Sequence, residues 1–218
     1  MKLYQHQINA IGRARKGNLG IFHEPGCGKT CTALHIIRHW VAKGCTKILV
    51  VCPISIIESA WLEDCATFTP ERDIISVWDT KPAERKRKLA EDHEIYVINF
   101  DQLKILFNEI VKKEFDVLII DESSKLKNPN SEISKAVLAL SGIHCRGSRY
   151  ICGKPIPHRY LMSGTPAPNS YQEYWAQAKV ITGPGNAVFS DNFYSFRGQY
   201  FYSIPLGPVC KKWEFRKE

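Results

Sequence analysis

Short, continuously apolar runs alternate along the chain with longer segments whose apolar positions recur every three or four residues. The short runs are typical of buried parallel strands, and the longer segments are typical of helices that bury one face. The predicted strands lie at residues 20–22, 47–52, 74–78, 95–98, 116–120 and 160–162. The predicted helices lie at residues 3–14, 31–42, 55–68, 81–92, 102–113, 131–141 and 170–180. This alternation predicts an α/β fold with a doubly wound, mainly parallel sheet.

Length and composition narrow the class of protein. With 218 residues, 44% of them hydrophobic, the chain can bury one sizeable core and is expected to form a single compact unit. Its formal net charge of +8 suits a polyanionic partner. No apolar run approaches membrane-spanning length, and the polar residues that follow Met1 differ from a signal peptide. The eight cysteines are scattered, several of them within apolar patterns, as reduced thiols are, so we expect a cytoplasmic protein with no membrane partner.

The stretch from residue 20 to residue 30 has the pattern of a phosphate-binding loop: an apolar strand, a glycine-rich turn and the start of a helix. The residues expected to surround the phosphates are Pro25, Gly26, Cys27, Gly28, Lys29 and Thr30. Glycines let backbone N–H groups converge on an anion, and the dipole of the following helix adds positive potential. Lys29 is expected to reach the β- and γ-phosphates, and the Thr30 hydroxyl to bind Mg²⁺. His23 stands where the commoner phosphate-loop pattern, G-x-x-x-x-G-K-[ST], has its first glycine.

A second signal is a pair of carboxylates, Asp121 and Glu122, that directly follows the apolar run at 117–120. Ligands bind at the carboxyl ends of strands in open α/β sheets. Asp121 is therefore expected to hold Mg²⁺, directly or through water, and Glu122 to polarise the attacking water. A divalent cation would also offset the repulsion between the two neighbouring charges.

The phosphate loop and the later Asp-Glu pair, in this order, resemble superfamily 2 helicases with their DEAD/DEAH-like motif, and specifically the Swi/Snf-like branch with its phage-encoded members. The resemblance implies a RecA-like P-loop NTPase domain that uses ATP and Mg²⁺ and acts on double- or single-stranded DNA. It implies catalytic roles for Lys29, Asp121 and Glu122, with Mg²⁺ held at Thr30 and Asp121. A P-loop kinase is disfavoured because it leaves the later motifs unexplained.

Further stretches match this branch in order. Gln7 lies in a stretch similar to the adenine-reading Q motif, and an exposed helical glutamine is the alternative interpretation. By the same resemblance, the residues on the nucleic-acid side are Pro53, Ser55 and Asn99, and those that couple the nucleotide site to DNA are Ser163, Gly164 and Thr165. Ser55 also suits a helix N-cap. The segment after Asp121 departs from the branch at Ser124, where a histidine is common.

Motors of this superfamily place ATP between two RecA-like domains, and the second domain supplies an arginine finger. No stretch after residue 170 resembles the motifs of that domain. We therefore expect residues 1–182 to form the first, ATP-binding motor domain and 183–218 to extend toward a second one, supplied in cis or in trans. The function implied is a DNA-dependent ATPase, weakly active alone, that moves on or remodels DNA. The alternative is a non-catalytic half-helicase that binds DNA or protein.

Two regions leave alternatives open. His144, Cys145, Cys152 and His158 offer the side chains of a Cys₂His₂ zinc site, although their spacing lacks a close cysteine pair and favours an exposed basic insertion loop. The tail at 189–215 is rich in aromatic residues interleaved with cations, and similar stretches occur in phage relatives. Its rings suit either base stacking or packing against protein, and packing is the preferred interpretation.

Overall fold

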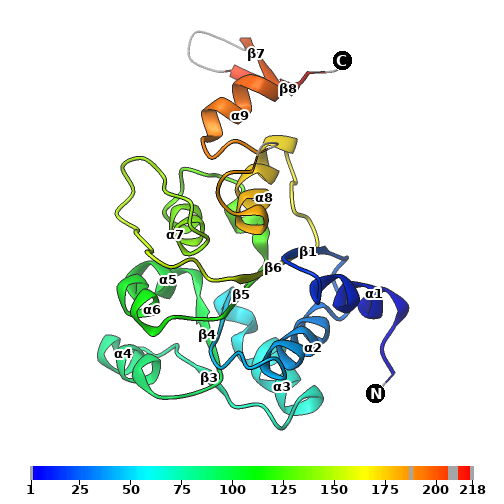
Figure 1. Cartoon of the computed structure of the whole chain (residues 1–218), viewed down its shortest axis with the longest axis vertical. Coiled ribbons are helices and arrows are strands. Elements are labelled where there is room, and N and C mark those ends of the chain that lie inside the picture. Colours follow the sequence, from blue (N-terminus) through cyan, green and yellow to red (C-terminus); the bar gives the residue numbers. More distant parts are fainter. Residues whose placement is uncertain (1, 187–188, 206–210, 217–218) are drawn as a thin grey trace.

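The computed structural model describes residues 2–186, 189–205 and 211–216, and its main feature is a six-stranded sheet (Figure 1). The strand order is β1-β6-β5-β2-β4-β3, and every pairing is parallel. The strands are β1 (Leu19–Phe22), β2 (Ile48–Cys52), β3 (Ile74–Ser76), β4 (Ile95–Asn99), β5 (Val117–Asp121) and β6 (His158–Ser163). The predicted fold class, a doubly wound parallel sheet, is confirmed.

Alternate residues of the central strands enter two separate cores. One core combines Ile48, Val50 and Ile119 with the helices α1 (Gln5–Ala14), α2 (Lys29–Val41) and α3 (Glu63–Phe68). The other combines Leu49, Val51 and Ile120 with helices on the opposite face, shown to the left and above in Figure 1. Those helices are α4 (Pro82–Ala90), α5 (Phe100–Ile105), α6 (Phe107–Lys113), α7 (Glu132–Leu140) and α8 (Tyr174–Thr182). Because both faces are covered, β2 is apolar throughout and β5 is apolar up to Ile120.

Two predicted helices are divided in the structure. The segment predicted as a helix at 102–113 forms α5 and α6, because Leu106 leaves helical geometry at φ −98° and ψ 14°. The segment predicted at 55–68 begins as a 3₁₀ turn, η1 (Ile54–Ile56), continues as a π-helix, η2 (Ile57–Leu62), and ends as α3. Apolar periodicity located both segments but did not resolve their breaks.

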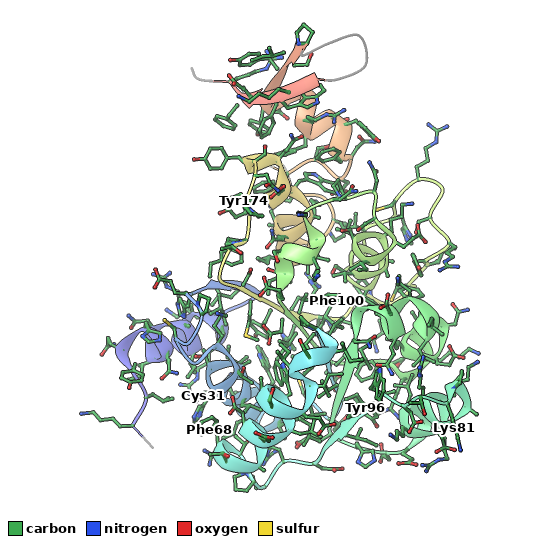
Figure 2. All side chains as sticks on the ribbon, turned by 180° about the vertical axis from the view of Figure 1, so that it is seen from behind. Cys31, Phe68, Lys81, Tyr96, Phe100 and Tyr174 are labelled. Atoms are coloured by element: carbon green, nitrogen blue, oxygen red, sulfur yellow. The ribbon has the colours of Figure 1, made fainter. Side chains whose placement is uncertain are left out.

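The C-terminal elements project from one end of the sheet domain, above α8 in Figure 1. They are α9 (Phe193–Tyr200) and an antiparallel hairpin of β7 (Phe201–Pro205) and β8 (Lys211–Phe215). Figure 2 labels Tyr174 at this junction, beside an apolar groove of about 530 Å³ between α8 and the hairpin. Phe196 and Phe201 are buried, which confirms packing for these two rings of the tail. The domain boundary at residue 182 stays a prediction.

The loop between α7 and β6 forms no zinc site in the described part of the chain. The His158 ring stacks on Trp40 at 3.5 Å between centroids, and the Cys152 thiol donates to the Lys154 carbonyl at 3.0 Å. The loop is also not simply an exposed insertion, because Cys152 and Tyr150 are buried. Arg159, the second residue of β6, is buried and donates to backbone carbonyls, so it is not available to nucleic acid.

Candidate nucleotide site

The phosphate loop connects β1 to α2, and its shape depends on two glycines with positive φ. Gly26 has φ +79°, and Gly28 has φ +66° and serves as the N-cap of α2. The positive φ of Gly28 favours glycine, and a Cβ there would also lie 2.5 Å from the side-chain nitrogen of Gln7. Lys29 and Thr30 open the helix, and the Lys29 ammonium donates to the carbonyl oxygens of His23 and Glu24 at 2.9 and 3.1 Å. The lysine therefore lies over its own loop.

Residues of α1 close one side of this loop. Gln7 is buried, accepts a hydrogen bond from the Tyr4 N–H at 2.9 Å and donates to the Gly28 carbonyl at 3.2 Å. A ring nitrogen of His6 lies 2.9 Å from the Cys27 carbonyl oxygen. The Q-motif glutamine is thus brought to the phosphate loop rather than left exposed on a helix. Its contact with the base stays a prediction.

Asp121 ends β5 with its carboxylate held from two directions. The indole N–H of Trp61 donates to Oδ2 at 3.1 Å, and the Glu122 backbone N–H donates to Oδ1 at 3.0 Å. The residue is only 7% exposed, and this burial raises the pKa of Asp121 against the lowering effect of the Trp61 hydrogen bond. The positive charge of Lys29 also lowers this pKa, as its smallest influence.

Glu122 connects the acidic motif to the segment after β6. Its backbone is left-handed, at φ +62° and ψ 58°, a conformation that costs a non-glycine residue on the order of 1–3 kcal/mol. One carboxylate oxygen, Oε1, accepts from the Ser124 hydroxyl at 2.6 Å and from the Ser163 hydroxyl at 2.9 Å. The Ser163 hydroxyl also accepts from the Thr165 N–H at 3.2 Å. Ser124, where the branch commonly has histidine, therefore still orients the acidic motif.

Gly164 lies directly against the phosphate loop. A Cβ at this position would meet the Pro25 Cδ at 3.0 Å, so the two loops approach closely only because residue 164 is glycine. Phe22, the last residue of β1, pairs in register with Ser163 at the end of β6. The predicted phosphate, metal and coupling residues are thus brought together at the carboxyl ends of β1, β6 and β5, which we call the carboxyl edge.

Sequence reasoning missed three polar contacts at this edge. Trp61 reaches Asp121 from η2, and Ser123 donates to the buried Gln177 of α8 at 2.7 Å. The Gln177 amide in turn donates to the Pro166 carbonyl at 2.6 Å. Because these partners come from distant segments, no local spacing signals them.

The three predicted nucleic-acid residues follow the neighbouring strands β2 and β4, where Cys52 pairs with Asn99. Pro53 is half-buried, and Ser55 is exposed within η1 rather than at its N-cap, so the N-cap prediction for Ser55 was wrong. The Asn99 side chain instead caps α5 by accepting from the Gln102 N–H at 2.8 Å. The three residues share the edge with the nucleotide residues but lie toward its other end.

The residues present fit a magnesium–triphosphate group. No side chain caps the first turn of α2, whose N–H groups point into the glycine loop. The His23 Nδ1 atom is buried in the same loop without a hydrogen-bond partner. Asp121 offers the carboxylate oxygens that Mg²⁺ prefers. An anion at the loop and a cation at Asp121 would suit these groups.

A family model for the SNF2-related domain matches residues 10–186. The chain belongs to this family. A SWI/SNF-related chromatin regulator, the subfamily A-like protein 1 homolog of Caenorhabditis elegans, is 29% identical over 90% of this chain and 26% of its own length. The human DNA excision repair protein ERCC-6 is 25% identical over 69% of this chain and 10% of its own length. The chain therefore spans about a quarter or less of these relatives.

The fold also matches solved structures. The Sulfolobus solfataricus SWI2/SNF2 ATPase core in complex with dsDNA superimposes with a TM-score of 0.73 at 22% identity. The match covers 92% of this chain and 39% of that one. The RecA-like fold predicted for this chain is therefore shown, and the Swi/Snf-like resemblance is confirmed. The phage affiliation stays a prediction.

Proposed function

We propose that this chain is the ATP-binding first motor domain of a DNA-dependent ATPase, which moves on or remodels DNA when paired with a second RecA-like domain. The observation that carries the proposal is strand register: the phosphate loop with Lys29 follows β1, and Asp121 and Glu122 end β5, with β6 pairing to both strands and Ser163 bonded to Glu122. The sheet is that of a SNF2-family domain. The DNA complex of the archaeal relative supports DNA as the partner.

In this mechanism, α2 and the glycine loop bind the triphosphate through backbone N–H groups, and Lys29 exchanges its loop carbonyls for phosphate oxygens. Thr30 and Asp121 would hold Mg²⁺, which offsets phosphate charge when bound. Glu122 orients the attacking water and accepts its proton. Ser163, hydrogen-bonded to both Glu122 and Thr165, would change partners with the state of Glu122. This change would couple the nucleotide site to Pro53, Ser55 and Asn99, which lie farther along the same carboxyl edge on the DNA side. Gln7 selects adenine.

The second domain would supply an arginine finger, worth on the order of 10³–10⁵ in rate in related phosphoryl transfer. We therefore expect weak hydrolysis by the isolated chain. The cytoplasmic location is supported by the free thiols of the seven cysteines in the described part of the chain. None of the described helices is long and apolar enough to cross a membrane.

The test is ATP hydrolysis with and without duplex DNA, for the chain alone and mixed with a second SNF2-type motor domain. Stimulation by DNA in the mixture, abolished by Lys29→Ala, is the expected result. ATP binding without any stimulation, together with unimpaired DNA binding by Lys29→Ala, would favour the non-catalytic half-helicase.

A further inference from the structure

The Asp121 carboxylate receives one hydrogen bond from a side chain that no motif assigns to the nucleotide site. Trp61 is fully buried, and its indole N–H lies 3.1 Å from Asp121 Oδ2. The other carboxylate oxygen is held at 3.0 Å by the Glu122 N–H. The two donors together determine the plane of the carboxylate and leave the remaining lone pairs directed away from them.

The local backbone brings this indole to the site. Trp61 lies in η2, a six-residue π-helix between the 3₁₀ turn η1 and the α-helix α3. Insertion of a π-turn into a helix rotates the residues that follow and is frequent at functional sites. The strand before it, β2, pairs with β5 up to Val51 and Ile120, so the chain leaves β2 beside the end of β5. Trp61 therefore reaches from η2 to the carboxylate at the end of β5.

We propose that Trp61 is a positioning residue for Mg²⁺: its indole N–H orients the Asp121 carboxylate for the cation of the bound nucleotide. The inference rests on the proposed nucleotide function. Partners that orient metal-binding carboxylates typically change metal affinity 10- to 100-fold when they are removed. Trp61 itself touches neither nucleotide nor metal in this role.

A purely structural role for Trp61 is the competing explanation, because the ring also fills the core beneath α2. The chain offers matched controls that separate the two. Trp40 donates its indole N–H to the Tyr160 hydroxyl at 2.6 Å, and Trp175 donates to the Ser190 carbonyl at 2.9 Å. Neither bond reaches the acidic motif. Replacing any of the three indoles by phenylalanine removes an N–H and keeps an aromatic ring.

The experiment titrates Mg²⁺ into the whole chain with a fluorescent, non-hydrolysable ATP analogue and records the concentration for half-maximal binding. Trp61→Phe is expected to raise this concentration at least 10-fold, while Trp40→Phe and Trp175→Phe stay within about twofold of the original chain. In an Asp121→Asn background, Trp61→Phe should add no further shift, because its acceptor is already altered.

Two different failures are distinguishable. Binding of the analogue without any Mg²⁺ dependence in the original chain would overturn the proposed nucleotide function. If binding depends on Mg²⁺ and Trp61→Phe changes the half-maximal Mg²⁺ concentration no more than the two control variants do, only the role of Trp61 is overturned. This holds even if Trp61→Phe lowers the unfolding temperature.

A second measurement covers the case in which Trp61→Phe does not fold. In the ¹⁵N-labelled original chain with bound analogue, added Mg²⁺ should move the indole resonance of Trp61 and leave those of Trp40 and Trp175 in place. A stationary Trp61 resonance on Mg²⁺ saturation contradicts the proposal.

Discussion

The carboxyl edge of the sheet and the C-terminal extension, residues 183–216, are ordered by different forces. At the edge, buried or half-buried polar groups are held by short hydrogen bonds, such as those from Ser163 and Ser124 to Glu122. In the extension, rings pack on rings, and Phe196 lies 5.2–5.8 Å between centroids from Phe189, Tyr200 and Phe201. Hydrogen bonds are directional and can exchange partners, whereas apolar packing attaches without specifying a direction. The hydrogen-bonded edge is therefore suited to catalysis, and the ring packing is suited to holding the extension against the sheet domain.

The sharpest test of this comparison is a change at the edge that alters chemistry and not packing. Glu122→Gln keeps the side-chain shape and an acceptor for the two serine hydroxyls but removes the base. DNA-stimulated hydrolysis in the two-domain mixture should fall about 10²–10⁴-fold, or about 3–5 kcal/mol in the barrier. Binding of the ATP analogue should persist. Full turnover in this variant would remove Glu122 from the mechanism.

The corresponding change in the extension is Phe196→Ala, which removes a ring that is 6% exposed. The extension should lose about 3–4 kcal/mol of local stability. Hydrogen exchange should show faster amides in α9 and β7 with unchanged protection in β1 to β6. Tyr194→Ala, at a side chain that is 57% exposed, is the control and should lose no more than about 0.5 kcal/mol. Equal loosening of the sheet would show that the two regions unfold together.

One polar contact that joins the extension to α8 resembles those of the edge: fully buried Lys179 of α8 pairs with the half-exposed Asp191. Asp191→Asn leaves the ammonium with neutral partners only, the new side-chain amide oxygen and the Phe189 carbonyl at 3.0 Å. Breaking a fully buried pair costs about 3–5 kcal/mol, and the exposure of Asp191 reduces our expectation to about 2 kcal/mol. Chemical denaturation of the original chain and of Asp191→Asn measures this difference in the free energy of unfolding.

The same pair predicts a pH dependence. The hydrogen bond from Lys179 holds the pKa of Asp191 below its ordinary value, so the folded chain binds that proton less readily than the unfolded chain. The stability it contributes is complete above the ordinary aspartate pKa of about 4 and is lost as the pH falls through the lower folded value. The difference between the original chain and Asp191→Asn should therefore be full at neutral pH and shrink in acid. A constant difference would contradict the ion pair.

The smallest expected effect concerns the DNA end of the carboxyl edge. Ser55→Ala removes an exposed hydroxyl in η1 and should weaken duplex DNA binding about fivefold, near 1 kcal/mol for one neutral hydrogen bond. The slope of log affinity against log salt should not change, because no charge is removed. Fluorescence anisotropy at several salt concentrations measures both. Ser195→Ala on α9 should behave like the original chain, and an equal loss there would place DNA on the extension.

The amino-acid sequence by itself determined the strands, the sheet class and the position of the phosphate loop. Continuous apolar runs such as 48–52 require burial on both faces, and few arrangements other than a parallel sheet covered by helices supply it. The glycine positions in the loop were equally readable, because positive φ at Gly26 and Gly28 excludes most other residues. The strands and the loop depend on local backbone stereochemistry and on the spacing of apolar residues, and both can be read directly from the sequence.

Only the tertiary structure decided which polar side chains meet at the edge. Trp61 lies 60 positions from Asp121, and Ser163 lies 41 positions from Glu122. The contacts of Trp61 and Ser163 follow from the strand order and from the π-helical geometry of η2. Neither feature changes the spacing of apolar residues along the sequence, so that spacing does not predict the contacts. The packing of the aromatic tail was also decided by the tertiary structure. The sequence favoured packing over base stacking but did not show which rings are buried, and the structure buries Phe196 and Phe201 in the core. The local spacing of apolar residues predicts the helices and strands, and long-range packing decides which side chains contact one another.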